Sequence, residues 1–319
     1  MLGGTSLLGL TGGLRDAFRG GADEPAVASF VGSDTCAGCH QAEAKLWRGS
    51  HHQEAMDHAT EASVLGDFNG ASFDYYGVRS RFFRQDGKFL VETDGPDGEL
   101  ATFQVKYTFG VYPLQQYLIE FPDGRVQALS LAWDSRPKEQ GGQRWLHLFP
   151  NEEIKHDDIL HWTRLNQNWN FMCAECHSTG VRKNYDAASD RFATTWAEID
   201  VGCEACHGQG SRHVAWARGR QGWWPFAKDE DPAAGLLVRF DERHDIRWSI
   251  DPATGNPARN FRPALVRKEV ETCGLCHARR AEFSEDWIPG RSLSDTHLVA
   301  QLTRGLYQAD GQMQDEVYK

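Results

Sequence analysis

Residues 201–213 read VGCEACHGQGSRH, in which Cys203 and Cys206 are separated by two residues and His207 follows directly. The same Cys-x-x-Cys-His pattern recurs as CAGCH at 36–40, CAECH at 173–177 and CGLCH at 273–277. The four pentapeptides contain all eight cysteines of the chain. The class of protein can therefore be inferred from these four repeats.

Cys-x-x-Cys-His is the attachment sequence of c-type haem. On one helical turn, residues i and i+3 share a face and i+4 lies close beside them. The two thiols can then bond the two vinyl groups of one porphyrin, and the His becomes the proximal iron ligand. We expect four covalently bound haem c groups. The attaching cysteines are Cys36, Cys39, Cys173, Cys176, Cys203, Cys206, Cys273 and Cys276, and the proximal ligands are His40, His177, His207 and His277.

Two other uses of these cysteines were weighed against haem attachment. Closely spaced Cys-x-x-Cys pairs are usually redox-active or metal-binding rather than framework disulfides. Two zinc sites would need the same number of pairs, but zinc gives no reason for a His after every second Cys. Haem attachment explains both the spacing and the four histidines.

Nine further histidines are available as second axial ligands. Only four methionines exist, and Met172 abuts Cys173, so His/His ligation and a low reduction potential are expected. His213 follows the third motif after Gly208 and Gly210, which permit a sharp turn, so it can reach a neighbouring haem. His51 and His52 are too far along the chain from His40 to ligate its own iron, but they can reach another.

The pattern between the motifs predicts the fold class, mainly α with long loops around a tetrahaem core, plus an inserted antiparallel β-meander, α+β overall. A helix is expected from the first motif to about Ala62. Aromatic and β-branched segments separated by Asp-Gly and Pro-Asp-Gly turns predict the meander. Its segments are Ser72–Val78, Lys88–Glu92, Thr102–Phe109, Gln115–Phe121 and Arg125–Trp133. The expected divisions are a flexible tail at 1–32, a first haem segment at 33–66, a β-rich insertion at 67–139 and a three-haem segment at 140–319.

The stretches around the four motifs resemble the multihaem cytochrome c family that includes the tetrahaem electron acceptor of hydroxylamine oxidoreductase. Larger relatives continue into further haems and tetratricopeptide repeats, so the native chain could extend beyond Lys319. The resemblance implies that His213 is the distal ligand of the haem on His40, and His52 that of the haem on His207. It implies His297 for the haem on His277. The second haem of the relative lacks a distal protein ligand; here His161 is a candidate for the haem on His177. His51 and His147 are alternates.

Three functions were weighed. The first is electron transfer through four low-spin haems between redox partners. The second is a multihaem oxidoreductase with an open haem at His177, acting on a small nitrogen or sulfur compound. Its candidate proton donors are His147, His156, His161, Asp157 and Asp158. The third is a protomer of a haem-stacked conductive filament.

Charge and hydropathy restrict the partners. The formal net charge is −11, which argues against nucleic-acid binding and favours redox partners with basic docking surfaces. No apolar run is long enough to span a membrane, and self-association stays open. Residues 1–14 contain no Lys or Arg, so they lack the basic start of a secretory signal. A periplasmic or extracellular location is expected from haem c attachment itself.

Overall fold

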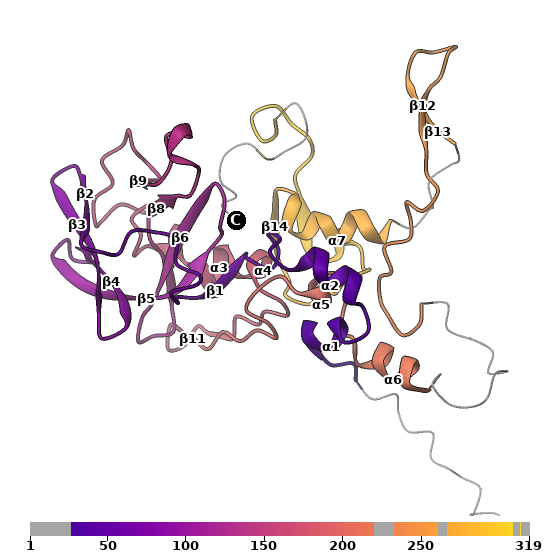
Figure 1. The fold of residues 1–319 in the computed structure, drawn as a ribbon, viewed down its shortest axis with the longest axis horizontal. Coiled ribbons are helices and arrows are strands. Elements are labelled where there is room, and N and C mark those ends of the chain that lie inside the picture. Colours follow the sequence, from indigo (N-terminus) through magenta and orange to yellow (C-terminus); the bar gives the residue numbers. More distant parts are fainter. Residues whose placement is uncertain (1–26, 220–232, 261–266, 309–312, 314–319) are drawn as a thin grey trace, which may run out of the picture.

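The computed structural model describes residues 27–219, 233–260, 267–308 and 313, and combines a large antiparallel sheet with a group of short helices. In Figure 1 the sheet lies on the left and the helices lie to its right. Of the described residues, 28% are in strands and 20% are helical. The expectation of a mainly α fold is therefore wrong. The motifs need only one helical turn each, whereas the segment between the first two motifs builds a continuous sheet.

The described part of the chain forms one nine-stranded sheet in which every pairing is antiparallel. Its main path runs β2-β3-β4-β5-β6-β8-β9, with β1 paired to β5 and β7 paired to β6. The sheet curves until its first and last strands, β2 and β9, contact each other. The strands are β1 Met56–His58, β2 Ala71–Tyr75, β3 Val78–Gln85, β4 Lys88–Asp94, β5 Leu100–Phe109, β6 Leu114–Glu120, β7 Val126–Ala128, β8 Leu131–Asp134 and β9 Arg144–His147.

An aromatic core fills the inner face of this curved sheet. Phe82 is fully buried and its ring stacks on Trp145, with 3.5 Å between ring centroids. Gly66 packs directly against this core, and its N–H donates to the Tyr117 hydroxyl at 2.9 Å. Only glycine fits there, because a Cβ would lie 2.4 Å from that oxygen. The tryptophans of this region therefore fill the core of the sheet.

The helices are short and most of them carry a motif. They are α1 Ser33–Ala37, α2 Gln41–Trp47, α3 Trp169–Met172, α4 Ala174–His177, α5 Cys203–His207, α6 Ser211–Gly219 and α7 Lys268–His277. Three 3-10 turns lie at Lys138–Gln140, Leu165–Gln167 and Leu293–Asp295. Three two-stranded hairpins complete the described chain: β10 Tyr185–Asp186 with β11 Arg191–Phe192, β12 Trp248–Ile250 with β13 Pro257–Arg259, and β14 Arg280–Glu282 with β15 His297–Val299.

The helix expected to run from the first motif to about Ala62 ends much earlier, at Trp47. Gly49 follows with φ +71°, and the chain then enters strand β1. Met56 is 1% exposed and pairs with Phe109 of β5, and the N–H of Gly110 donates to the Ala55 carbonyl at 2.9 Å. Pairing with β5 overrides the local helix preference for two reasons. It provides hydrogen-bond partners for the backbone of this segment, and it buries the Met56 side chain.

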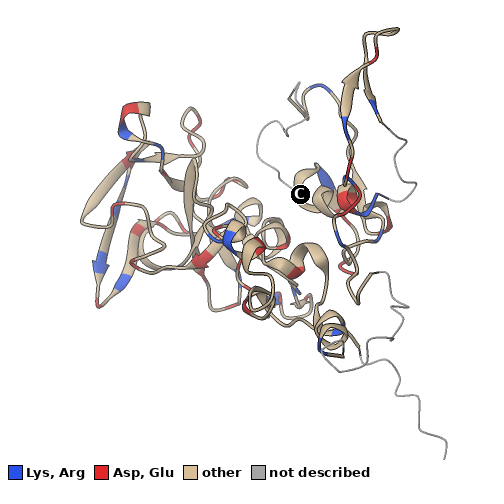
Figure 2. Cartoon of the chain, turned by 45° about the vertical axis from the view of Figure 1, so that its right-hand side comes forward, with Lys and Arg blue, Asp and Glu red and all other residues tan. Residues whose placement is uncertain are grey.

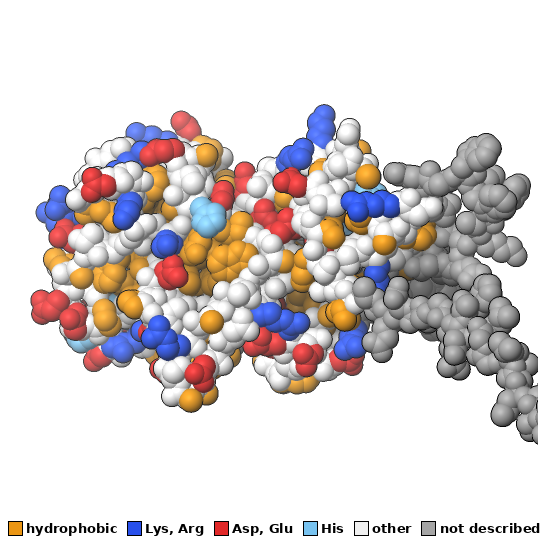
Figure 3. Space-filling model, turned by 90° about the horizontal axis from the view of Figure 1, so that it is seen from below, with side chains coloured by type: hydrophobic (Ala, Val, Ile, Leu, Met, Phe, Trp, Pro, Cys, Tyr) orange, Lys and Arg blue, Asp and Glu red, His pale blue; other side chains and the backbone are white. Residues whose placement is uncertain are grey.

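Charged residues of both signs are spread along the sheet and the helices (Figure 2). Hydrophobic side chains gather near the middle of one face, where the sheet meets the helical part (Figure 3).

Among the described residues, no helix has the length and apolar character that crossing a bilayer requires. The larger part of the expected tail, 1–26, lies outside the described residues, whereas residues 29–33 are bound to the third motif, as described below.

Candidate functional site

Each Cys-x-x-Cys-His motif lies on or directly beside a short helix. Helices α4, α5 and α7 end at the motif histidine itself, and α1 contains Cys36, with Cys39 and His40 just beyond it. After the third motif the chain turns at Gly208, where φ is +79° and a Cβ would meet Leu237 at 2.6 Å. Glycine at this position allows the turn that leads into α6 and His213.

The thiols of different motifs lie next to one another. Helix α1, which carries Cys36, contacts α5, which begins at Cys203, and helix α4 contacts α7. The Cys36 thiol lowers the pKa of Cys203 to about 6, and the Cys176 thiol raises the pKa of Cys276. Burial, and then the nearby Cys273, raise the pKa of Cys206 to about 11. None of the eight cysteines forms a disulfide. The four motifs thus meet in one part of the molecule.

Several histidines bind backbone carbonyls through Nδ1. The Nδ1–H of His177 donates to Ala55 at 3.0 Å, that of His207 to Val238 at 2.8 Å and that of His213 to Ala234 at 2.7 Å. This hydrogen bond fixes the tautomer in which Nε2 has a free lone pair. It is the arrangement usual for a histidine that ligates a metal.

The rings of two histidine pairs lie at the spacing of axial ligands. The ring centroids of His40 and His213 are 5.9 Å apart, and those of His52 and His277 are 6.2 Å apart. Two metal–nitrogen bonds of about 2 Å and about 1.1 Å from each nitrogen to its centroid give about 6 Å. The residues therefore fit a haem iron between the rings of each pair. Burial, and then His277 and His51, lower the pKa of His52, which favours the neutral ring that a metal ligand needs.

The first of these pairs is the one implied by the family resemblance, and the second is different. The resemblance implies His52 for the haem on His207 and His297 for the haem on His277. The structure instead brings His52 to His277. The ring nearest to His207 among the described contacts belongs to Phe240, at 4.8 Å, and His51 lies near Tyr112 at 6.3 Å.

His297 is 1% exposed and lies beside the second motif. Its Nε2 is 3.3 Å from Glu175 Oε1 without hydrogen-bond geometry, and its Nδ1 is 2.8 Å from the Thr296 hydroxyl. Ligand atoms of Glu175, Glu282 and His297 lie within 4.8 Å of one another. Arg280 already pairs with Glu175, and Lys183 with Glu282, so these carboxylates are neutralised by side chains rather than poised for a cation.

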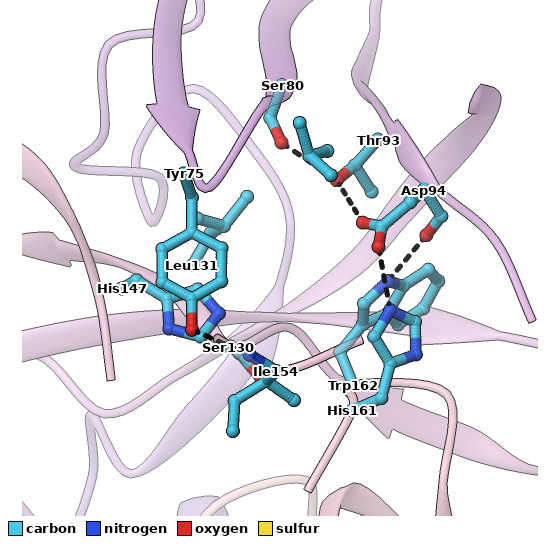
Figure 4. A pocket seen from close by; sticks show the side chains of 11 residues that line it. Tyr75, Ser80, Thr93, Asp94, Ser130, Leu131, His147, Ile154, His161 and Trp162 are labelled. Carbon is cyan, nitrogen blue, oxygen red and sulfur yellow. Dashed lines mark hydrogen bonds and ion pairs between the residues drawn. The ribbon is translucent and has the colours of Figure 1, made fainter. Parts of the chain in front are cut away.

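His147 and His161 lie in the sheet part of the molecule, around a cavity of about 20 Å³ (Figure 4). This volume has room for about one water molecule. Both His161 nitrogens are occupied, by Asp94 at 3.0 Å and by Thr163 at 2.8 Å. His147 stacks on Tyr75 with centroids 3.6 Å apart, and burial lowers its pKa to about 4. The contacts of the His147 and His161 rings therefore lie in the sheet part of the molecule, whereas His177 lies on helix α4.

Sequence reasoning missed two aromatic residues at the motifs. Phe109, the last residue of β5, lies 4.1 Å from the His177 ring, and Phe240 lies beside His207. Phe240 adopts a left-handed backbone conformation with φ +58°. No local pattern distinguishes either residue, because each is brought to its motif by tertiary packing.

The family model described as cytochrome c554 and c-prime matches residues 35–67 and 133–208. These segments contain three of the four motifs and omit most of the sheet. The match supports a multihaem cytochrome c family.

A solved structure has a similar fold. The outer cell wall cytochrome OcwA matches with a TM-score of 0.51 and 16% identity, covering 91% of this chain and 49% of that chain. At this identity the likeness concerns the fold alone, and the chain spans about half the length of OcwA. No curated protein matches the sequence.

Proposed function

We propose that the chain is an electron-transfer cytochrome with four covalently bound haem c groups, which relays electrons between redox partners outside the cytoplasmic membrane. The observation that carries the proposal is the meeting of four haem-attachment motifs with two histidine pairs at 5.9 and 6.2 Å. When bound, haem c supplies an iron that takes up and releases one electron. The protein residues hold and orient that group.

Two of the proposed sites have both axial ligands assigned. Cys36, Cys39 and His40 hold one haem with His213 as its distal ligand. Cys273, Cys276 and His277 hold another with His52 as its distal ligand. The Nδ1–H bond of His213 to Ala234 fixes its ring in the orientation that ligation needs.

The other two sites are defined by their motifs. Cys173, Cys176 and His177 hold one haem, and Cys203, Cys206 and His207 hold the other. The Nδ1–H bonds of both histidines fix their tautomers in the same way. Phe109 and Phe240 pack against these two rings and limit their rotation.

Contacts between the motif helices support a spatial order for the proposed sites. Helix α1 of the first motif contacts α5 of the third, Cys273 of the fourth motif raises the pKa of Cys206 in the third, and helix α7 of the fourth contacts α4 of the second. The sites thus follow one another without a break from the first motif to the second, which lies against the sheet. A continuous series of this kind suits a relay.

The test replaces distal histidines one at a time. In His213→Ala and His52→Ala we expect one haem in four to become high-spin in the electron paramagnetic resonance spectrum, because one axial nitrogen is lost. The exposed His244→Ala is the matched control and should leave the spectrum unchanged. Unchanged low-spin spectra in both variants would contradict the ligand assignment.

A further inference from the structure

A short segment before the first motif is bound by two carboxylates, one within the third motif and one a few residues before it. Residues 29–33 precede Cys36 in sequence, whereas Glu198 and Glu204 lie more than 160 residues later. Three successive backbone N–H groups, those of Val31, Gly32 and Ser33, donate to these two side chains. The contacts join segments that sequence alone leaves unconnected.

Glu204 is the residue directly after Cys203 and is only 2% exposed. Its carboxylate accepts from Val31 N–H at 3.0 Å, from Gly32 N–H at 2.7 Å and from Gly210 N–H at 2.7 Å. Gly210 can approach this closely because a Cβ there would lie 3.2 Å from Glu204 Oε1. Every one of these bonds uses the oxygens as acceptors, as an ionised carboxylate requires.

Glu198 makes the second connection through Ser33. Its oxygens accept from Ser33 N–H at 2.7 Å and from the Ser33 hydroxyl at 2.8 Å. The Ser33 oxygen in turn accepts from Cys203 N–H at 3.0 Å. Ser33 thus joins the start of helix α1 to the start of helix α5, and the thiols of Cys36 and Cys203 meet beside this junction.

The negative charge of this group has no Lys or Arg ion-pair partner among the described residues. In the part of the chain that the structure describes, neither Glu198 nor Glu204 forms an ion pair with Lys or Arg. Burial, and then the charge of Glu198, raise the pKa of neighbouring Asp200 to about 7. The carboxylates are therefore stabilised by backbone N–H groups and by the Ser33 hydroxyl, which leaves their net charge in place.

We propose that Glu204 and Glu198 form an anionic clasp that fixes the first haem site against the third and lowers the reduction potentials of these two haems. The inference rests on the proposed haem-binding function and adds positioning residues to it. A fixed negative charge in a poorly solvated region stabilises the ferric over the ferrous iron, since the ferric form carries one more positive charge. Backbone hydrogen bonds hold that charge in place without neutralising it.

The test compares the near-isosteric variant Glu204→Gln with Ser33→Ala by spectroelectrochemical titration of the haem-loaded protein. Removing the charge should raise the reduced-to-oxidised ratio of one or two haems about tenfold at a fixed potential, which is about 59 mV for one electron. Ser33→Ala loosens the junction but keeps both charges, so its titration should match the wild type. Glu99→Gln, at an exposed turn of the sheet, controls for overall charge.

Limited proteolysis provides a readout that does not depend on redox chemistry. Both Glu204→Gln and Ser33→Ala should be cleaved faster within residues 27–33 than Glu99→Gln. Glu198→Gln replaces Glu204→Gln if the latter does not mature, and should shift the titration in the same direction. A Glu204→Gln titration identical to the wild type, or an equal shift in Ser33→Ala, would overturn the electrostatic role. Protein that contains no haem would instead contradict the proposed function.

Discussion

At the scale of single residues, the imidazole rings differ in what their Nδ1 atoms do. His177, His207 and His213 donate Nδ1–H to a backbone carbonyl and so present a lone pair at Nε2. His147 does the opposite, because its Nδ1 accepts from Phe149 N–H at 3.1 Å and its proton is on Nε2. Tautomer thus separates these three rings from the His147 ring that packs in the sheet.

The burial of His147 predicts an acid-sensitive stability. Its pKa falls from 6.5 to about 4 on folding, so the unfolded chain binds more protons between these values. Stability should therefore decrease as the pH falls from about 6.5 to about 4, by about 3 kcal/mol in total for this group. His147→Gln should flatten this part of the pH profile of denaturant unfolding.

The exposed His244→Gln is the control for that profile and should keep the slope of the wild type. A His147→Gln profile with the full wild-type slope would show that another group causes the acid sensitivity.

At the scale of elements, part of the sheet could be predicted from the sequence. The predicted segments Lys88–Glu92, Thr102–Phe109 and Gln115–Phe121 coincide with most of β4, β5 and β6. Strand β3 was missed, although Ser80 and Phe82 alternate with exposed Arg79 and Arg81 as a half-buried strand should. The exposed arginines lower the hydrophobicity of this segment, so its strand character shows only in the alternation.

Other elements could not be read locally. The stretch after Trp47 contains good helix formers, but tertiary pairing with β5 makes it turn and strand. The eight cysteines proposed to attach haem follow from spacing alone, because the proposed chemistry is confined to five residues. The pairing of His52 with His277 does not, since it joins residues 225 positions apart through the packing of the whole helical part.

The alternation in β3 predicts unequal costs for two neighbouring phenylalanines. Phe82 is completely buried against Trp145, whereas Phe83 is only partly buried on the opposite face. Phe82→Ala should lower the free energy of unfolding by about 3–5 kcal/mol. Phe83→Ala is the matched control, with a clearly smaller loss in the same denaturant experiment. Equal losses would contradict the inward orientation of Phe82.

At the scale of the whole molecule, the sheet contributes a platform beside the second motif, and the helical part gathers the four motifs. The contact of Phe109 with His177 and the hydrogen bond from His177 to Ala55 connect the two parts. The sheet thereby helps to orient a proposed iron ligand as well as enlarging the protein.

The net charge predicts how the haem-loaded chain would meet a proposed redox partner. With a formal charge of −11, electron exchange with a small basic cytochrome c as acceptor should be fast at low salt. Raising the ionic strength should slow the second-order rate by about tenfold, because salt screens the attraction. Stopped-flow mixing measures the rate, and an acidic acceptor is the control. A rate to the basic acceptor that does not fall with salt would contradict electrostatic steering.

The proposal that this chain binds four haem c groups is tested by counting its haems. The protein is matured in a host that attaches c-type haem, and a pyridine haemochrome assay is combined with quantitative amino-acid analysis. We expect four haems per chain, and three in a variant with both cysteines of one motif replaced by alanine. Absence of haem, or a count that does not change when a motif is removed, would contradict it.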